Sequence, residues 1–216
     1  MRSMKHPKRK SGSPSDKPKV RARDRENAES KRAHCLETAT TIKQLMHCLN
    51  IRPEDWDVII AADGSGQTFD SPGGWGSVVV RRDMLPVLCF GGASHLSSQA
   101  AELFAILHPL LYLTSERIGV KINGCRAVII SDSKNTCNGL AVEDPLWVSQ
   151  YSGAHLPLWL SLHALKRHGL TYVIRHVPRD RAFLQKACHD LANIARKHQA
   201  GVREKLDWSD EELSAF

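Results

Sequence analysis

Short apolar runs alternate with longer amphipathic stretches over most of this chain, and they predict strands and helices in a definite order. Residues 57–62 (DVIIAA) and 126–131 (RAVIIS) are apolar runs rich in β-branched residues, which is typical of buried strands. Residues 75–82, 85–91 and 171–176 predict three further strands. The first two of these follow 57–62 after short connections, so we expect an antiparallel meander.

Apolar residues at helical spacing predict the remaining elements. Ser97 and Ser98 are N-cap candidates for a helix that starts near Gln99, and Pro109 should kink this helix or end its first half. Three more helices are predicted: a short one that ends near residue 140, one over 155–168 and one over 187–198. The fold class is therefore α/β, with a five-stranded mixed sheet in which three antiparallel strands precede parallel ones, flanked by helices.

The N-terminal part of the chain has a different composition from the rest. Residues 1–34 hold twelve Lys and Arg against four Asp and Glu, a net charge of +8, whereas the remainder carries −1. We predict a disordered basic arm over 1–24, a helical linker or accessory helix over 25–52, the main domain over 53–201 and an acidic tail over 202–216. The arm is expected to bind nucleic acid, although a solubilising tail has the same composition.

The six cysteines form no C-x-x-C pair and fall in predicted helices, strands and turns alike. This distribution predicts reduced, partly buried thiols in an intracellular, cytoplasmic protein. No apolar run follows the basic N-terminus, and none approaches the roughly 20 residues of a membrane span. We therefore expect neither a secretory signal nor a membrane partner.

Four carboxylates among apolar neighbours are the candidate chemistry of the chain. Asp63 and Asp132 follow two predicted strands, and Glu102 and Asp190 lie near the starts of two predicted helices. Each alone has a plainer explanation as a turn residue, a cap or a helix-terminal charge. Buried together they would need cations, and paired divalent ions held by carboxylates catalyse phosphodiester hydrolysis.

In this order the segments resemble type 1 ribonuclease H. The resemblance runs from about residue 57 to 199 and rests on five segments: DGS (63–65), GGWG (73–76), the AEL that holds Glu102, SDS (131–133) and HDLANIAR (189–196). It implies an RNase H-like catalytic domain that hydrolyses the RNA strand of RNA·DNA hybrids and leaves 5′-phosphate and 3′-hydroxyl ends. It also implies two Mg²⁺ ions, replaceable by Mn²⁺, as cofactors, with Asp63, Glu102, Asp132 and Asp190 as their ligands.

The resemblance assigns an auxiliary role in proton transfer and product release to a mobile histidine. His176 at the end of the fifth predicted strand is the first candidate, and His189 is the second. The 14 positions from His176 to Asp190 exceed the usual spacing in that family. A histidine at a strand end can also simply bond the backbone.

The resemblance further implies hybrid contacts through the minor groove, made by Gly64, Ser65, Ser97, Ser98 and Gln99. Many members also carry a basic, Trp-containing helix and loop before the penultimate helix. Here residues 141–154 contain no Lys or Arg, although Trp147 and Tyr151 are present. We expect the basic arm to supply the affinity for the hybrid that such a helix and loop would give. We also expect a monomer.

Two alternatives remain at the level of sequence. Integrases and resolvases share this sheet and an acidic centre, so the chain could be an RNase H-fold nuclease that acts on another nucleic-acid structure. It could also be a catalytically silent nucleic-acid-binding module.

Overall fold

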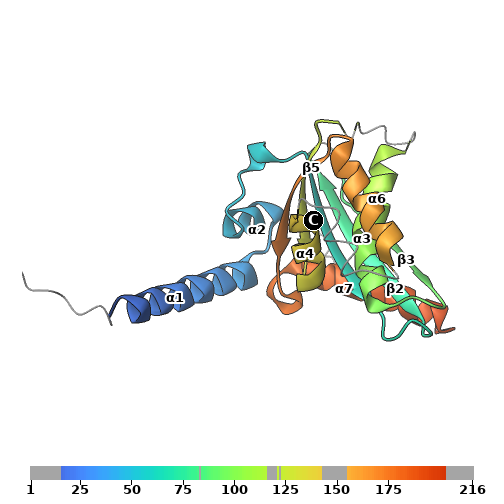
Figure 1. The fold of residues 1–216 in the computed structure, drawn as a ribbon, viewed down its shortest axis with the longest axis horizontal. Helices are drawn as coiled ribbons and strands as arrows, with labels where there is room; N and C mark the ends of the chain where they lie inside the picture. Colours follow the sequence, from blue (N-terminus) through green and yellow to red (C-terminus); the bar gives the residue numbers. More distant parts are fainter. Residues whose placement is uncertain (1–15, 83, 116–120, 122, 143–154, 203–216) are drawn as a thin grey trace, which may run out of the picture.

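The fold is centred on a single mixed sheet, which Figure 1 shows edge-on among its helices. The computed structural model describes residues 16–82, 84–115, 121, 123–142 and 155–202. The sheet order is β3-β2-β1-β4-β5, with β1 (Val58–Ser65) in the middle. β1 pairs antiparallel with β2 (Gly73–Arg81), which pairs antiparallel with β3 (Val87–Ala93). On its other edge β1 runs parallel to β4 (Arg126–Ser131), and β4 runs parallel to β5 (Thr171–His176). The predicted fold class is confirmed.

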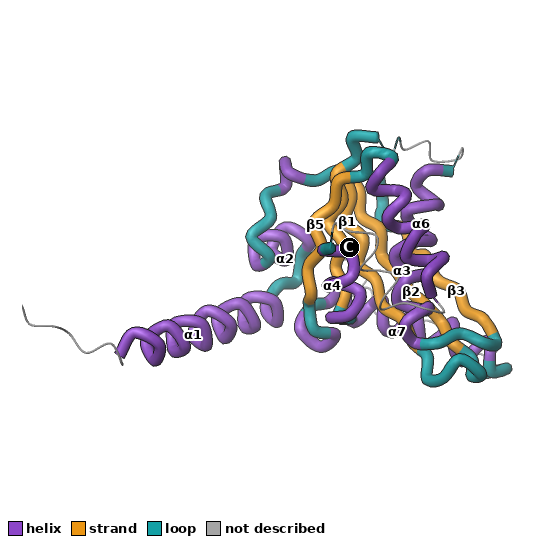
Figure 2. The backbone as a smooth tube through the Cα atoms, in the orientation of Figure 1, coloured by secondary structure: helices purple, strands orange, loops and turns teal. Residues whose placement is uncertain are grey.

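Helices cover both faces of this sheet, as the tube view in Figure 2 shows. One core cluster joins the sheet to α3 (Ser98–Thr114), α4 (Lys134–Ala141) and α6 (Leu156–Arg167). The other joins it to α7 (Phe183–Gln199), α2 (Ile42–Cys48) and the end of α1 (Asp16–Thr38). Two short 3-10 turns, η1 (Pro53–Asp55) and η3 (Arg179–Arg181), precede β1 and α7. α3 and α7 therefore reach β1 from opposite faces.

Of the two outcomes expected at Pro109, a kink or the end of the first half of the helix, the end is wrong, because α3 continues through the proline to Thr114. A proline has no N–H, so the carbonyl of Ala105 one turn earlier loses its helical donor. The hydroxyl of Ser77, fully buried on β2, donates a hydrogen bond to that carbonyl instead. The replacement donor keeps the buried carbonyl satisfied and lets the helix pass over the sheet unbroken.

Glycines on β2 let α7 lie directly on the sheet. A Cβ at Gly74 would stand 2.3 Å from the carbonyl oxygen of Ala192, and one at Gly76 would stand 2.5 Å from the carbonyl oxygen of Cys188. No side chain fits at either distance. The G-G-W-G segment is thus needed for the close approach that fixes which face of α7 meets the sheet.

The N-terminal helices differ from the sequence prediction in three respects. α1 begins at Asp16 rather than near residue 25, and α2 is separate from it. The break is a capping box at Thr41, whose side chain accepts from the backbone N–H of Gln44, while the Gln44 side chain accepts from the Thr41 N–H. The two helices are joined by a disulfide between Cys35 and Cys48, so the expectation of six reduced thiols is wrong for this pair.

The C-terminal helix also begins earlier than expected. α7 starts at Phe183, so Asp190 lies in its third turn and not in its first. No described helix is both long and apolar enough to cross a membrane. The expectations for residues 1–15, for Trp147 and Tyr151 and for residues 203–216 lie outside the described part of the chain.

Candidate functional site

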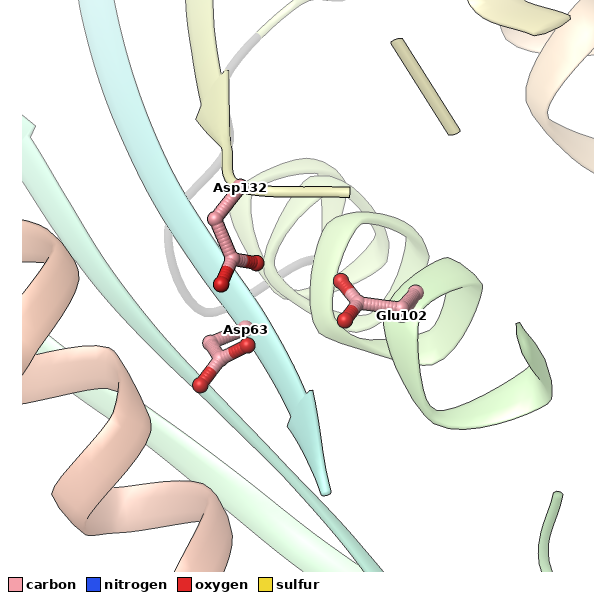
Figure 3. A group of neighbouring side chains, drawn as sticks. All are labelled: Asp63, Glu102 and Asp132. Atoms are coloured by element: carbon pink, nitrogen blue, oxygen red, sulfur yellow. The ribbon is translucent and has the colours of Figure 1, made fainter. Parts of the chain in front are cut away.

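Three carboxylates from three different elements converge at the edge shared by β1 and β4 (Figure 3). Asp63 lies in β1, Asp132 follows the last residue of β4, and Glu102 comes from the second turn of α3. One carboxylate oxygen of each lies within 4.8 Å of the others. Because β1 and β4 are parallel neighbours, their acids emerge together.

Burial makes this arrangement electrostatically unfavourable without a cation. Asp63 is fully buried and Glu102 is 6% exposed. Burial, reinforced by the charge of Asp132, raises the pKa of Asp63 to about 6. Burial raises the pKa of Glu102 to about 9, with further contributions from Asp63 and Asp132. At neutral pH the metal-free site therefore keeps a proton on Glu102.

Two side chains partly offset the charge of Asp63. The guanidinium of Arg179, on η3, donates from Nη2 to Asp63 Oδ1 at 3.2 Å and from Nε to Asp132 Oδ2 at 3.0 Å. His189 Nδ1, on α7, lies 2.8 Å from the other Asp63 oxygen, Oδ2. Arg179 thus occupies the position of a bridging cation between two of the three acids.

The donor set suits a hard divalent cation. All three groups offer carboxylate oxygens, the ligands that Mg²⁺ and Mn²⁺ prefer. Glu102 Oε2 is buried and has no hydrogen-bond partner, whereas a bound cation would satisfy it. The residues therefore fit a divalent metal.

The fourth predicted carboxylate is not part of this group. Asp190 is partly exposed, and among the described residues the acidic group comprises Asp63, Glu102 and Asp132 alone. Its neighbour His189 reaches Asp63 instead. Successive helical residues point about 100° apart, so the two side chains leave α7 in different directions.

His176 lies beside the acidic group, at the end of β5. Its Nε2 is 3.0 Å from the backbone carbonyl oxygen of Asp132. A carbonyl only accepts, so Nε2 carries a proton in this contact. The plainer explanation, a strand-end histidine bonded to backbone, therefore holds in this state, and the same bond keeps the ring next to the site.

The predicted substrate-binding residues surround the start of α3. Ser97 caps this helix by accepting from the N–H of Ala100, and its Oγ is 3.1 Å from His155 Nε2. Ser98 is exposed, whereas the amide of Gln99 donates to the hydroxyl of Thr136 at 3.2 Å. Capping thus accounts for Ser97, and Ser98 is free to face solvent.

Gly64 and Ser65, at the end of β1, have structural contacts of their own. A Cβ at Gly64 would lie 2.4 Å from the backbone nitrogen of Glu102, so glycine permits α3 to approach β1 closely. Ser65 Oγ donates to Asn193 Oδ1 at 2.8 Å and accepts from Arg196 Nε at 2.9 Å. Both residues therefore help to place the site.

Three further residues of this neighbourhood were not predicted from the sequence: Arg179, Asn193 and Arg196. The last two follow His189 at positions i+4 and i+7 and so share its helix face. Arg179 follows β5, whose C-terminal end lies at the same sheet edge as the acids. Both patterns lie within or directly after elements that the sequence predicts, the strand over 171–176 and the helix over 187–198.

Comparison with solved structures finds the same architecture repeatedly. The N-terminal RNase H domain of a Mycobacterium tuberculosis protein, solved as a fusion with maltose-binding protein, aligns with a TM-score of 0.53 at 21% identity, covering 67% of this chain and 96% of that one. An RNase H1 isolated from compost by a metagenomic approach aligns at 0.52 and 18%, covering 67% and 98%. Its complex with an RNA/DNA hybrid aligns at 0.52 and 17%, covering 66% and 99%.

No protein-family profile and no curated protein sequence matches the chain. At identities of 17–21%, the structural similarities establish that this chain has the RNase H fold.

Proposed function

We propose that this protein is a metal-dependent ribonuclease H, an endonuclease that hydrolyses the RNA strand of RNA·DNA hybrids. The observation that carries the proposal is the group of three acids, two of them buried, at the shared edge of β1 and β4, with Glu102 Oε2 left without a hydrogen-bond partner. A structural role does not account for this cluster, in which burial and neighbouring carboxylates raise the pKa values of Asp63 and Glu102. A divalent-metal site does.

Asp63, Glu102 and Asp132 would hold two Mg²⁺ ions, for which Mn²⁺ substitutes. When bound, such ions activate the attacking water and stabilise the leaving oxygen, which gives 5′-phosphate and 3′-hydroxyl ends. The backbone N–H of Gly64 favours the ionised form of the Glu102 carboxyl and so partly opposes the effect of burial on its pKa. His176, whose Nε2 is hydrogen-bonded to the backbone carbonyl of Asp132, would exchange a proton with the leaving group.

The RNA strand would lie across the start of α3. Ser98 is exposed there, and the side chain of Gln99 is held by a hydrogen bond to the hydroxyl of Thr136. Short polar groups of this kind suit the 2′-hydroxyls of a wide minor groove. The backbone at Gly64 would lie near the same strand.

The basic arm would add affinity for the hybrid. α1 extends away from the body in Figure 1 and is attached at its C-terminal end, where Glu37 pairs with Arg181 of η3. Residues 22–32 of this helix are exposed wherever their side chains are described. Deletion of residues 1–34 should weaken hybrid binding and flatten its salt dependence by about 0.7–0.9 in slope per lost phosphate contact. An unchanged slope would exclude the arm from binding.

The decisive test is cleavage of an end-labelled RNA·DNA hybrid in Mg²⁺ and in EDTA, beside RNA·RNA and DNA·DNA duplexes. We expect metal-dependent cleavage of the RNA strand in the hybrid alone, and its loss in Asp63→Asn. Asp180→Asn is the matched control, because it removes an exposed carboxylate from η3, outside the acidic group. Cleavage of a DNA duplex or junction instead would indicate another RNase H-fold nuclease. Hybrid binding without cleavage in Mg²⁺ or Mn²⁺ would indicate a silent binding module.

Two further expectations remain predictions. A monomer would give a single species of about the chain mass of 24.1 kDa in sedimentation. A reducing, cytoplasmic location requires that Cys35 and Cys48 be reduced in protein taken from cells under thiol-trapping conditions. Oxidised Cys35 and Cys48 in that experiment would exclude it.

A further inference from the structure

A row of hydrogen bonds runs along α7 and ends at the acidic group. Arg196 Nε donates to Ser65 Oγ, Ser65 donates to Asn193 Oδ1, and Asn193 Nδ2 lies 2.7 Å from His189 Nε2. His189 Nδ1 then reaches Asp63 Oδ2 at 2.8 Å. The imidazole is thus placed by partners on one side and meets the site on the other.

We propose that His189 is a metal ligand, so that α7 contributes a nitrogen to a site whose other donors are oxygens. This inference rests on the metal site of the proposed function. Adjacent ligands of an octahedral ion at about 2.1 Å lie about 3.0 Å apart. The 2.8 Å between His189 Nδ1 and Asp63 Oδ2 is close to this separation, so both atoms reach one ion after a small shift. Among the described residues, His189 is not part of the group whose ligand atoms all lie within 4.8 Å, so it would share an ion with Asp63 and not with all three acids.

The partners of His189 serve both of its tautomers. In the metal-free arrangement the Asn193 amide donates to Nε2, so Nδ1 carries the proton and donates to Asp63. A metal requires the lone pair of Nδ1 and hence a proton on Nε2. Rotation of the Asn193 amide by half a turn presents Oδ1 to that proton and turns Nδ2 toward Ser65. The Ser65 oxygen has two lone pairs, so it accepts from Asn193 and from Arg196 together.

Such an outer partner is what a metal-bound histidine needs. The second ring nitrogen of a ligating histidine donates to an oxygen that fixes its tautomer and orientation. Asn193 supplies this oxygen, and Ser65 and Arg196 hold Asn193. A histidine that served only as a hydrogen-bond donor to Asp63 would not need a partner that can both donate to and accept from its other ring nitrogen.

A nitrogen ligand changes which metal the site prefers. Mg²⁺ takes oxygen ligands and retains its waters, whereas imidazole binds first-row transition ions well. We therefore expect this protein to bind Mn²⁺ more tightly than Mg²⁺. His189→Asp should reduce the ratio of the two affinities by about tenfold, the lower end of the range found when residues around a bound metal are changed.

The test uses the full-length protein with Mn²⁺ alone and needs no nucleic acid. Electron spin-echo envelope modulation of bound Mn²⁺ should show a directly coordinated nitrogen, whose pattern changes when histidine is labelled with ¹⁵N. His189→Asp should bind Mn²⁺ without this nitrogen signal. His176→Ala removes the other nearby imidazole and should keep it, as should Asp190→Asn. Calorimetric titration with Mn²⁺ and with Mg²⁺ gives the affinity ratio for each folded variant.

The outcomes separate the inference from the function on which it rests. Bound Mn²⁺ with no nitrogen signal in the wild-type protein overturns the inference and leaves the oxygen-ligand nuclease standing. A nitrogen signal lost in His176→Ala but kept in His189→Asp overturns it as well. Failure of the wild-type protein to bind Mn²⁺ overturns both. The wild-type spectrum alone decides the first and third cases, even if His189→Asp does not fold.

Discussion

The two helices that reach Asp63 from opposite faces of the sheet bring different chemistry to it. α3 contributes Glu102, a buried acid with a partnerless oxygen and a pKa of about 9. α7 contributes His189, whose ring nitrogens both have partners. One side of the site therefore lacks a counter-charge, while the other is already satisfied by hydrogen bonds.

The difference indicates which side requires a metal. Without a cation, Glu102 can enter the fold only by keeping its proton, because burial and two neighbouring acids oppose its ionisation. His189 is already satisfied without an ion, since Asp63 accepts from Nδ1 and the Asn193 amide donates to Nε2. On the proposed function α3 makes the site dependent on metal, and on the proposal for His189 α7 adjusts which metal it takes.

The largest effect should come from the α3 side. Glu102→Gln keeps the shape of the side chain and removes its charge, so it should lower hybrid cleavage by roughly 1,000-fold, as expected for the loss of several kcal/mol of metal-borne stabilisation. Single-turnover cleavage beside Asp180→Asn measures this. Near-normal cleavage by Glu102→Gln would mean that the metal does not depend on α3.

The same residue should make the stability of the metal-free protein depend on pH. The pKa of Glu102 is about 9 in the fold against an ordinary 4.5, so between these values the folded state holds a proton that the unfolded chain has lost. Stability therefore falls as pH rises through this window. In EDTA, the melting temperature should drop more for the wild-type protein than for Glu102→Gln between about pH 5.5 and 8.5. If the melting temperatures of the two proteins fell equally with pH, the raised pKa assigned to Glu102 would be wrong.

The α3 side could be predicted from the sequence because its signals are local. Apolar runs fixed β1 and β4, an acid at the end of each marked the shared edge, and Ser97 marked the start of α3. These features depend on near neighbours in the chain. A helix end at Pro109, one of the two outcomes expected there, is wrong because the compensating hydrogen bond comes from Ser77 on another element.

The α7 side could not be predicted in the same way. Its N-cap is Ala182, which provides no side-chain hydrogen bond, so the sequence carries no mark where the helix begins. The rotation of the helix is fixed instead by contacts with Gly74 and Gly76 of β2, far away in the chain. Successive helical residues point about 100° apart. An error of one residue in the predicted rotation of α7 therefore directs Asp190, and not His189, toward Asp63.

A smaller effect is expected from Arg179, which tests whether the carboxylates of the site need a cation. Its guanidinium bridges Asp63 and Asp132, so Arg179→Gln should lower the melting temperature in EDTA by about 2–4 °C. The difference should shrink in Mg²⁺, because the ion and the guanidinium neutralise the same carboxylates. Arg181, on the same turn, pairs with Glu37 instead. The change in melting temperature caused by Arg181→Gln should therefore not depend on Mg²⁺. Equal metal dependence in both variants would show that Arg179 does not compete with the ion.

The smallest effect should come from Asp190, the acid that the sequence pattern proposed for α7. It is partly exposed and lies outside the group of three, so Asp190→Asn should change cleavage by no more than about threefold, as expected for a substitution away from buried networks. His189→Asn, one position earlier on the same helix, should reduce cleavage further, because it removes the nitrogen nearest to Asp63. Single-turnover rates of the two variants rank the two residues directly. If Asp190→Asn lost as much activity as Glu102→Gln, α7 would supply an acid after rotating about its axis, and the two sides of Asp63 would be chemically alike.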